Sequence, residues 1–361
     1  MNFADLLRTL PIPIIQAPMV GASKEALALA VSGAGGMGTL AAGALAPAEI
    51  GPAVAAMRGA TDAPFAVNLL MAPAASPDSA EVQLALDRLA PWYAELGAAL
   101  PATPNQFAPN FDAQLAALTA AAPPVATFAF SVLTRAQVAA LQLAGTYVVG
   151  TATTVAEARA WSDVGADGIC AQGAEAGGHR GHFLDDVEAS LVGTMALVPT
   201  IRAATRLPVI AAGGIMDGRG IAAALVLGAS AVQMGTAFLL AEEAVTSVPW
   251  RRAVEGVEDE PTRLTRAFTG RYARGIENRF MREMRDVQDA VPAYPVQNRL
   301  TQPLRAAATE ADLPEMISLW AGQGVSMARP GKAADMVRQW WAEAGEVAAG
   351  LAVRTGRGSS G

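Results

Sequence analysis

Short runs of apolar residues recur along the chain, separated by segments with helical periodicity. Eight such runs predict strands at 12–18, 36–41, 65–71, 125–130, 147–151, 168–172, 208–212 and 231–234, the last extending toward Phe238. These runs are continuously apolar, which is typical of parallel strands covered on both faces. Eight strands alternating with helices predict an α/β fold, a (β/α)8 TIM-type barrel, with a doubly wound open sheet as the alternative.

The segments between the strands predict helices at 23–31, 47–57, 84–100, 111–121, 134–143, 154–163, 198–206, 218–227 and 332–348. Ser23 is expected to cap the first of them, and Pro47 suits the first position of the second. The interval 251–312 is too long for a plain connection and holds 21 charged residues, 11 of them arginine. Such a density predicts a solvated, mostly helical cap.

These features predict four parts of the chain. Residues 1–240 form the barrel, 241–317 the charged helical cap or second subdomain, 318–350 a segment that packs back on the barrel, and 351–361 a polar tail. In a (β/α)8 barrel, reactive groups gather on the loops at the carboxyl ends of the strands. We therefore expect the functional residues to lie on those loops.

Composition narrows the class of protein. Hydrophobic residues make up 52% of the 361 residues and charged residues 16%, so the chain can bury a large core. A net charge of −7 argues against a nucleic-acid or anionic-membrane partner. The single cysteine excludes an internal disulfide framework and suits a reducing compartment. The first residues are not typical of a signal peptide, and the uncharged window 26–48 is broken by five glycines, so we expect a cytoplasmic protein.

The loop at 172–182 follows the sixth strand and contains both histidines of the chain. A histidine in a glycine-rich loop at a strand end is positioned to exchange a proton near neutral pH. We expect His179 to be the acid or base and His182 to be either a support or a bystander; the alternatives are a structural histidine and a metal pair. A metal is disfavoured because no cysteine or carboxylate cluster accompanies the pair and Arg180 between them would repel a cation.

Three other residues near this loop have candidate roles. Glu175 either orients His179 or stabilises the loop, and Arg180 would attract an anionic substrate. Cys170 lies inside an apolar strand and is expected to be a core residue.

Two further loops predict an anion site. Gly213 and Gly214 follow the seventh strand and expose backbone N–H groups, and Asp217 then caps a helix whose amino end attracts anions. Gly235 and Thr236 follow the eighth strand. Loops at these places in (β/α)8 enzymes commonly bind phosphate, although tight barrel turns also need glycine.

Residues that suit a flat heterocycle lie at the same ends of other strands. Gln172 and Asn68 carry amides that can hydrogen-bond a ring edge, and Met19 and Met71 can press on its face, with core packing as the alternative for each methionine. Flavin mononucleotide (FMN) would satisfy both these groups and the phosphate site.

Six stretches together resemble the nitronate monooxygenase family: 172–181, 13–19, 67–69, 211–220, 233–236 and 269–278. The resemblance implies a barrel with a smaller second domain, His179 as catalytic base, and one non-covalent FMN. The FMN contacts it implies are Met19, Asn68, Gln172, Gly177, Gly213, Gly214, Gln233, Met234, Gly235 and Thr236. In that family an alkyl nitronate reduces the flavin, O2 reoxidises it, and the products are a carbonyl compound and nitrite, with no nicotinamide.

One segment departs from the family pattern. Where the family often shows Phe-His-Phe-Gly followed by proline, this chain has Phe128-Ala-Phe-Ser131. The difference leaves the preferred substrate open. The alternative functions are an FMN-dependent NAD(P)H reductase acting on a quinone or an enoyl thioester, and a barrel that only binds a phosphorylated ligand. We expect a homodimer, no metal, and small-molecule partners: a nitronate or nitroalkane, and O2.

Overall fold

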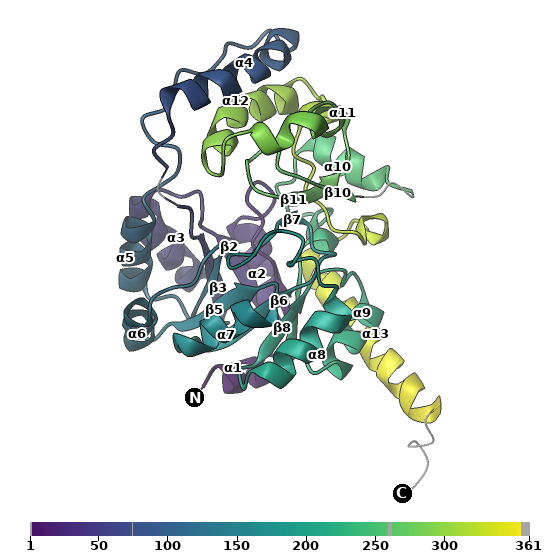
Figure 1. Ribbon diagram of the computed structural model, residues 1–361. Coiled ribbons are helices and arrows are strands. Elements are labelled where there is room, and N and C mark those ends of the chain that lie inside the picture. The colour runs from purple at the N-terminus through teal and green to yellow at the C-terminus, as the bar shows by residue number, and fades with distance from the viewer. Residues whose placement is uncertain (1, 74, 259–261, 355–361) are drawn as a thin grey trace, which may run out of the picture.

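The computed structural model describes residues 2–73, 75–258 and 262–354, and eight parallel strands form its centre (Figure 1). They are β1 (Ile14–Gln16), β2 (Gly38–Ala41), β3 (Phe65–Leu70), β4 (Val125–Ala129), β5 (Tyr147–Ala152), β6 (Gly168–Gln172), β8 (Val209–Ala212) and β9 (Ala231–Met234). The strands are ordered β1-β9-β8-β6-β5-β4-β3-β2. A parallel bridge between Ile15 and Met37 brings the two edges together, so the (β/α)8 barrel is confirmed.

Helices surround the barrel. They are α2 (Glu25–Gly33), α3 (Pro47–Ala60), α5 (Phe111–Ala121), α6 (Arg135–Leu143), α7 (Val155–Asp163), α8 (Thr194–Ala204) and α9 (Gly218–Val226). Asp217 caps α9 as expected, accepting from the N–H groups of Arg219 and Gly220. The expectation for Ser23 is wrong: Lys24 occupies the N-cap of α2 without a side-chain bond, and the Ser23 hydroxyl accepts from the Met19 N–H instead.

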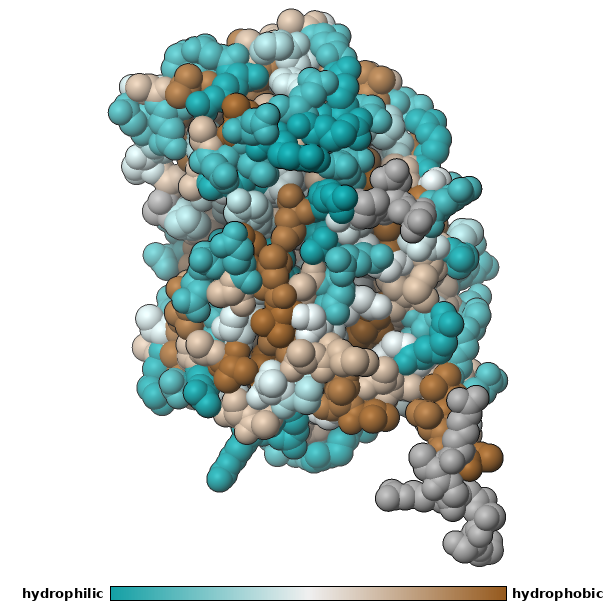
Figure 2. All heavy atoms as spheres, turned by 45° about the vertical axis from the view of Figure 1, so that its right-hand side comes forward, coloured by the Kyte–Doolittle hydropathy of each residue, from teal (hydrophilic) through white to brown (hydrophobic). Residues whose placement is uncertain are grey.

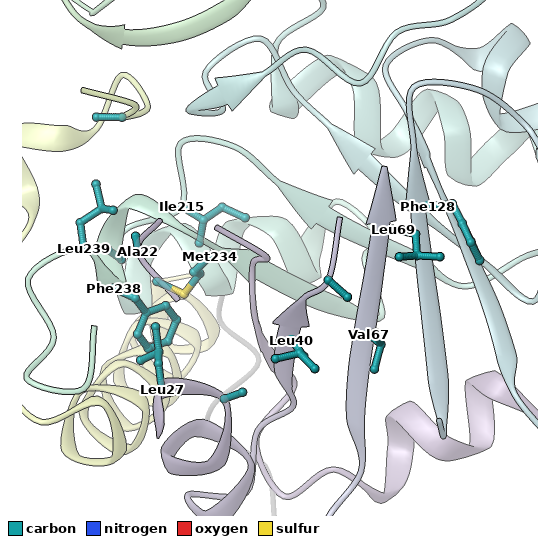
Figure 3. Close-up of a cluster of buried hydrophobic side chains, with 14 of the residues drawn as sticks. Ala22, Leu27, Leu40, Val67, Leu69, Phe128, Ile215, Met234, Phe238 and Leu239 are labelled. Carbon is teal, nitrogen blue, oxygen red and sulfur yellow. The ribbon is translucent and has the colours of Figure 1, made fainter. Parts of the chain in front are cut away.

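Two layers of apolar side chains make up the core. One lies between the barrel and its helices, and Figure 3 shows part of it around Met234 and Phe238. The other fills the barrel interior and includes Cys170 together with Phe3 and Leu7. Those two residues belong to α1 (Phe3–Thr9), a helix that the sequence analysis missed, which begins in a capping box between Asn2 and Asp5.

The cap lies over the carboxyl ends of the strands, at the top of Figure 1. It contains α10 (Val248–Glu255), β10 (Thr262–Thr265), β11 (Ala273–Ile276), α11 (Arg279–Glu283), the 3₁₀ turns η2 (Arg285–Ala290) and η3 (Pro314–Met316), and α12 (Val296–Glu310). Helix α4 (Ser79–Glu95) joins it, since the Tyr93 hydroxyl donates to the Leu300 carbonyl of α12 at 2.6 Å. Hydrophilic residues dominate this end of the surface (Figure 2).

The cap contains strands as well as the expected helices. A third short strand, β7 (Gly178–His179), comes from the histidine loop and pairs antiparallel with β11, which also pairs with β10. The four-part division of the chain stays a prediction, and the structure adds α4 to the cap.

The last helix returns to the barrel. After the 3₁₀ turns η1 (Thr236–Phe238) and η4 (Val325–Met327), α13 (Ala333–Arg354) packs against α9 and α2. Trp340 of α13 contacts Phe238, with 5.1 Å between the ring centroids. The helix includes the first four residues of the expected polar tail; residues 355–361 lie outside the described part. Among the described residues, no helix is long and apolar enough to cross a membrane.

Candidate active site

One large cavity of about 860 Å³ opens at the mouth of the barrel, between the strand ends and the cap. Ten of the eleven residues predicted for the site line it: Met19, Asn68, Gln172, Gly177, His179, Gly213, Gly214, Gln233, Gly235 and Thr236. The eleventh, Met234, is 1% exposed, and its side chain points into the core near Phe238 and Ile215 (Figure 3). The loops that were each predicted from the sequence to carry site residues therefore meet at one place.

Two glycine turns form one wall of this cavity. Gly213 and Gly214 have φ angles of 111° and 73°, a region that favours glycine. Within the described residues, the N–H groups of Gly214, Gly235 and Thr236 have no protein acceptor. The Thr236 hydroxyl is held by the Gly322 N–H at 2.9 Å. Free N–H groups from two adjacent turns suit the oxygens of a phosphate.

The two amide side chains differ in what they leave free. The Asn68 Nδ2 donates to the carbonyl and the hydroxyl of Thr127, and its Oδ1 has no partner among the described residues. The Gln172 Oε1 accepts from the Gly181 N–H at 2.8 Å, and its Nε2 donates to the His179 carbonyl at 3.1 Å. Asn68 thus offers an acceptor to a ligand, whereas Gln172 also holds the two ends of the histidine loop together.

His179 is placed by the cap. Strand β7 pairs with β11 so that His179 lies opposite Ala273, and its Nε2 lies 2.9 Å from the Thr269 hydroxyl oxygen. The rings of Phe130, Tyr294 and Trp320 surround the imidazole, with centroids 5.6, 5.7 and 5.7 Å from its own. The imidazole is therefore fixed in an aromatic wall of the cavity.

Burial, and to a smaller extent the positive charges of Arg271 and Arg305, lower the pKa of His179 to about 3. The pKa of His182 falls to about 4, first because of burial and then because of Arg271. Both rings are neutral at neutral pH in the folded protein. His179 can therefore accept a proton there, but it holds the proton weakly until a negative charge arrives beside it.

The two lowered pKa values predict acid lability. Below pH 6.5 the unfolded chain protonates both histidines while the folded chain does not, so the stability that the neutral rings contribute is complete above pH 6.5 and is lost as the pH falls. Each histidine should add at most about 1.4 kcal/mol per pH unit to the slope of the unfolding free energy against pH. The unfolding free energy, measured with urea between pH 7 and pH 4.5, should change less steeply with pH in the variant with His179→Asn and His182→Asn than in the unchanged protein. Equal slopes would contradict the prediction.

Two charged side chains of the histidine loop, those of Arg180 and Glu175, stabilise the loop through hydrogen bonds. Arg180 is fully buried, with a pKa that burial lowers to about 10, and it donates to the carbonyls of Gly173, Gln172 and Ser190. It does not line the cavity, so the expectation that it attracts a substrate is wrong. Glu175 accepts from the N–H and hydroxyl of Thr194 at the start of α8. Of the two roles considered for Glu175, the structure favours loop stabilisation.

The segment from Phe128 to Ser131, which departs from the family pattern, bends sharply at the cavity. Ala129 lines the cavity, and Phe130 has a φ of 84°, an uncommon value for a bulky residue. The Arg271 guanidinium lies 4.2 Å from the Phe130 ring centroid and hydrogen-bonds the carbonyls of Arg180 and His182. A strained backbone held by several contacts is typical of functional sites.

The cavity residues of the cap that the sequence analysis missed include Thr269, Tyr294 and Arg305. Thr269 opens a stretch that carries the family resemblance, which was its only signal. Arg305 is one of eleven arginines in the interval 251–312, and its neighbours in the sequence do not distinguish it from the others. Its guanidinium donates to Asn298 and has no carboxylate partner among the described residues. Burial lowers its pKa to about 10, so it remains a cation near neutral pH.

Metal ligands do not gather in the described chain, where no group of three or more His, Cys, Asp or Glu side chains lies close enough to hold an ion. Cys170 lies in the barrel interior, and burial raises the pKa of its thiol to about 12. The thiol is therefore protonated near neutral pH.

Comparison with known proteins adds to this geometry. The family model described as "Nitronate monooxygenase" matches residues 3–343. A protein named nitronate monooxygenase from Pseudomonas aeruginosa is 43% identical over 330 residues, which cover 90% of this chain and 94% of that protein. A crystal structure of nitroalkane oxidase from Streptomyces ansochromogenes has a TM-score of 0.90 at 42% identity, covering 96% of this chain and 99% of that one. The structure of FabK from Thermotoga maritima has a TM-score of 0.74 at 28% identity, covering 97% and 98% of the two chains.

Proposed function

The chain belongs to the nitronate monooxygenase family and is an oxidoreductase, and we propose that it uses FMN and O2 to convert alkyl nitronates and nitroalkanes into carbonyl compounds and nitrite. The observation that carries this proposal is the neutral His179 imidazole, which faces the same cavity as the free N–H groups of Gly214, Gly235 and Thr236. A proton acceptor and an anion cradle are thereby combined in one space.

The residues at the cavity fit FMN. The free N–H groups of the two glycine turns suit its phosphate, and the Asn68 Oδ1 suits an N–H at the edge of its ring. Gly235 packs closely on the loop after β1, because a Cβ there would lie 3.3 Å from the Ala17 Cβ. When bound, FMN would supply the acceptor for electrons from the substrate, and O2 would remove them.

His179 and the cap arginines would handle the substrate. A nitroalkane arrives neutral, and the His179 imidazole takes its α-proton as a general base, leaving the planar nitronate anion. Arg305 lines the cavity as a cation with no carboxylate partner among the described residues, so it attracts that anion. The rings of Phe130, Tyr294 and Trp320 pack around the imidazole and hold it in place. A nitronate that is already ionised needs no base.

Anaerobic mixing tests this function. We expect a preformed alkyl nitronate to bleach the bound flavin without any nicotinamide, and added O2 to restore the colour with release of nitrite. Visible absorbance in a stopped-flow instrument measures the first step, and a nitrite assay measures the second.

Two other outcomes would favour the alternatives. Rapid bleaching by NADH or NADPH, with none by nitronates, would favour a reductase of quinones or enoyl thioesters. A colourless protein that takes up no FMN would favour a barrel that only binds a phosphorylated ligand. The homodimer and the cytoplasmic location stay predictions from the sequence.

A further inference from the structure

The hydroxyl of Thr269 makes contacts that restrict the protonation of His179. Thr269 is 1% exposed and lies in the cap between β10 and β11. Its Oγ1 lies 2.9 Å from the His179 Nε2, donates to the Arg271 carbonyl at 3.0 Å, and accepts from the Arg271 N–H at 3.4 Å. Three partners therefore surround one hydroxyl group.

A hydroxyl has one proton to donate and two lone pairs to accept with. The Arg271 carbonyl takes the proton, and no other donor to that carbonyl is found in the described chain. The Arg271 N–H takes one lone pair, which leaves the second lone pair for His179. All three contacts are satisfied only when the His179 Nε2 carries a proton and donates it to Thr269.

The other ring nitrogen is then the basic one. In a neutral imidazole, protonation of Nε2 leaves the lone pair on Nδ1. Within the described residues, the His179 Nδ1 has no hydrogen-bond partner, and it is not one of the enclosed polar atoms. His182 differs, because its Nδ1 is both enclosed and without a partner. Of the two histidines only His179 lines the cavity, and Nδ1 is the ring nitrogen that its hydrogen bond leaves free.

We propose that Thr269 is a positioning residue that holds His179 as the Nε2–H tautomer, so that Nδ1 is the atom that removes the substrate's α-proton. This proposal rests on His179 being the base of the proposed function. After the transfer, the imidazolium carries protons on both nitrogens, and its Nε2–H still donates to the Thr269 hydroxyl. The ring therefore keeps its orientation through the step, and the proton it gained on Nδ1 faces the cavity.

The matched variants are Thr269→Val and Thr269→Ser. Valine keeps the shape of threonine but cannot accept a hydrogen bond, whereas serine keeps the hydroxyl and loses the methyl group. We expect Thr269→Val to lower kcat on neutral nitroalkanes by about 10- to 100-fold, a part of the contribution of a general base, with little change in KM. Thr269→Ser should recover most of that loss. Activity on preformed nitronates should change little in either variant.

Imidazole ¹⁵N NMR of the FMN-loaded protein observes the tautomer without turnover. The chain has only two histidines, and the signals that disappear in His179→Asn belong to His179. We expect a protonated Nε2 and an unprotonated Nδ1 in the unchanged protein and in Thr269→Ser, and a loss of that preference in Thr269→Val.

Several results would overturn the proposal. They are a protonated Nδ1 in the unchanged protein, an unaltered tautomer in Thr269→Val, and a Thr269→Ser variant as impaired as Thr269→Val, which would make the methyl group responsible. Failure of the proposed function has a different signature. His179→Asn would then lower activity on nitroalkanes and nitronates equally, while the NMR spectrum would still show whether Thr269 sets the tautomer.

Discussion

Replacing His179 with asparagine should lower kcat/KM for neutral nitroalkanes by about 10²- to 10⁴-fold, the usual contribution of a general base. The asparagine amide cannot take the α-proton at neutral pH. Bound FMN should be retained, because the free N–H groups assigned to its phosphate belong to the turns at Gly214, Gly235 and Thr236. Steady-state oxygen consumption measures the first effect, and the flavin absorbance per protein measures the second.

Two controls make this prediction specific. Preformed nitronates have already lost the α-proton, so the His179→Asn variant should lose much less activity on them. His182→Asn makes the same chemical change three residues away, at a ring that does not line the cavity, and should leave both activities nearly unchanged. An equal loss on nitroalkanes and nitronates would argue against His179 as the base.

Replacing Gly214 with valine should weaken the binding of FMN. Its φ of 73° lies in the left-handed region, where a β-branched residue costs about 1–2 kcal/mol, and a Cβ there would lie 3.3 Å from the Glu175 Cβ. We expect the strained turn to shift and to move the free N–H group of Gly214 with it. We expect FMN affinity to fall by about tenfold or more, measured by flavin fluorescence during titration of the apoprotein.

Gly165 provides a matched control for backbone strain. Its φ is 90°, and a Cβ there would meet nothing within 4 Å. It lies between α7 and β6, outside the residues that line the cavity. Gly165→Val should therefore lower the melting temperature while FMN affinity stays unchanged. If Gly214→Val binds FMN as tightly as Gly165→Val does, the assignment of Gly214 to the cofactor site is wrong.

Much of this architecture is visible in local sequence patterns. All eight predicted barrel strands are present, and the predicted sixth strand has the bounds that β6 has. The glycine turns after β8 and β9 lie where the phosphate site was predicted. These features depend on continuous apolar runs and on turns that need glycine, and both properties belong to a few neighbouring residues.

The errors have one physical origin. Arg180 stands beside His179 in the sequence, yet its guanidinium is buried against the carbonyls of Gly173 and Ser190. Helix α1 and strands β10 and β11 were missed because they are short, and their apolar faces have meaning only against distant partners. Which face of a loop points to the cavity depends on what packs against the other face.

Local patterns were thus sufficient for the barrel, its glycine turns, and the choice of His179 as the residue to examine. The folded chain was needed to show what surrounds that histidine. Thr269 lies 90 residues further along, and Tyr294 and Arg305 come from the same cap, which folds back over the mouth of the barrel. Hydrophobic periodicity and turn chemistry extend over a few residues, so they carry no information about which distant side chain meets the imidazole or which ring nitrogen it leaves free.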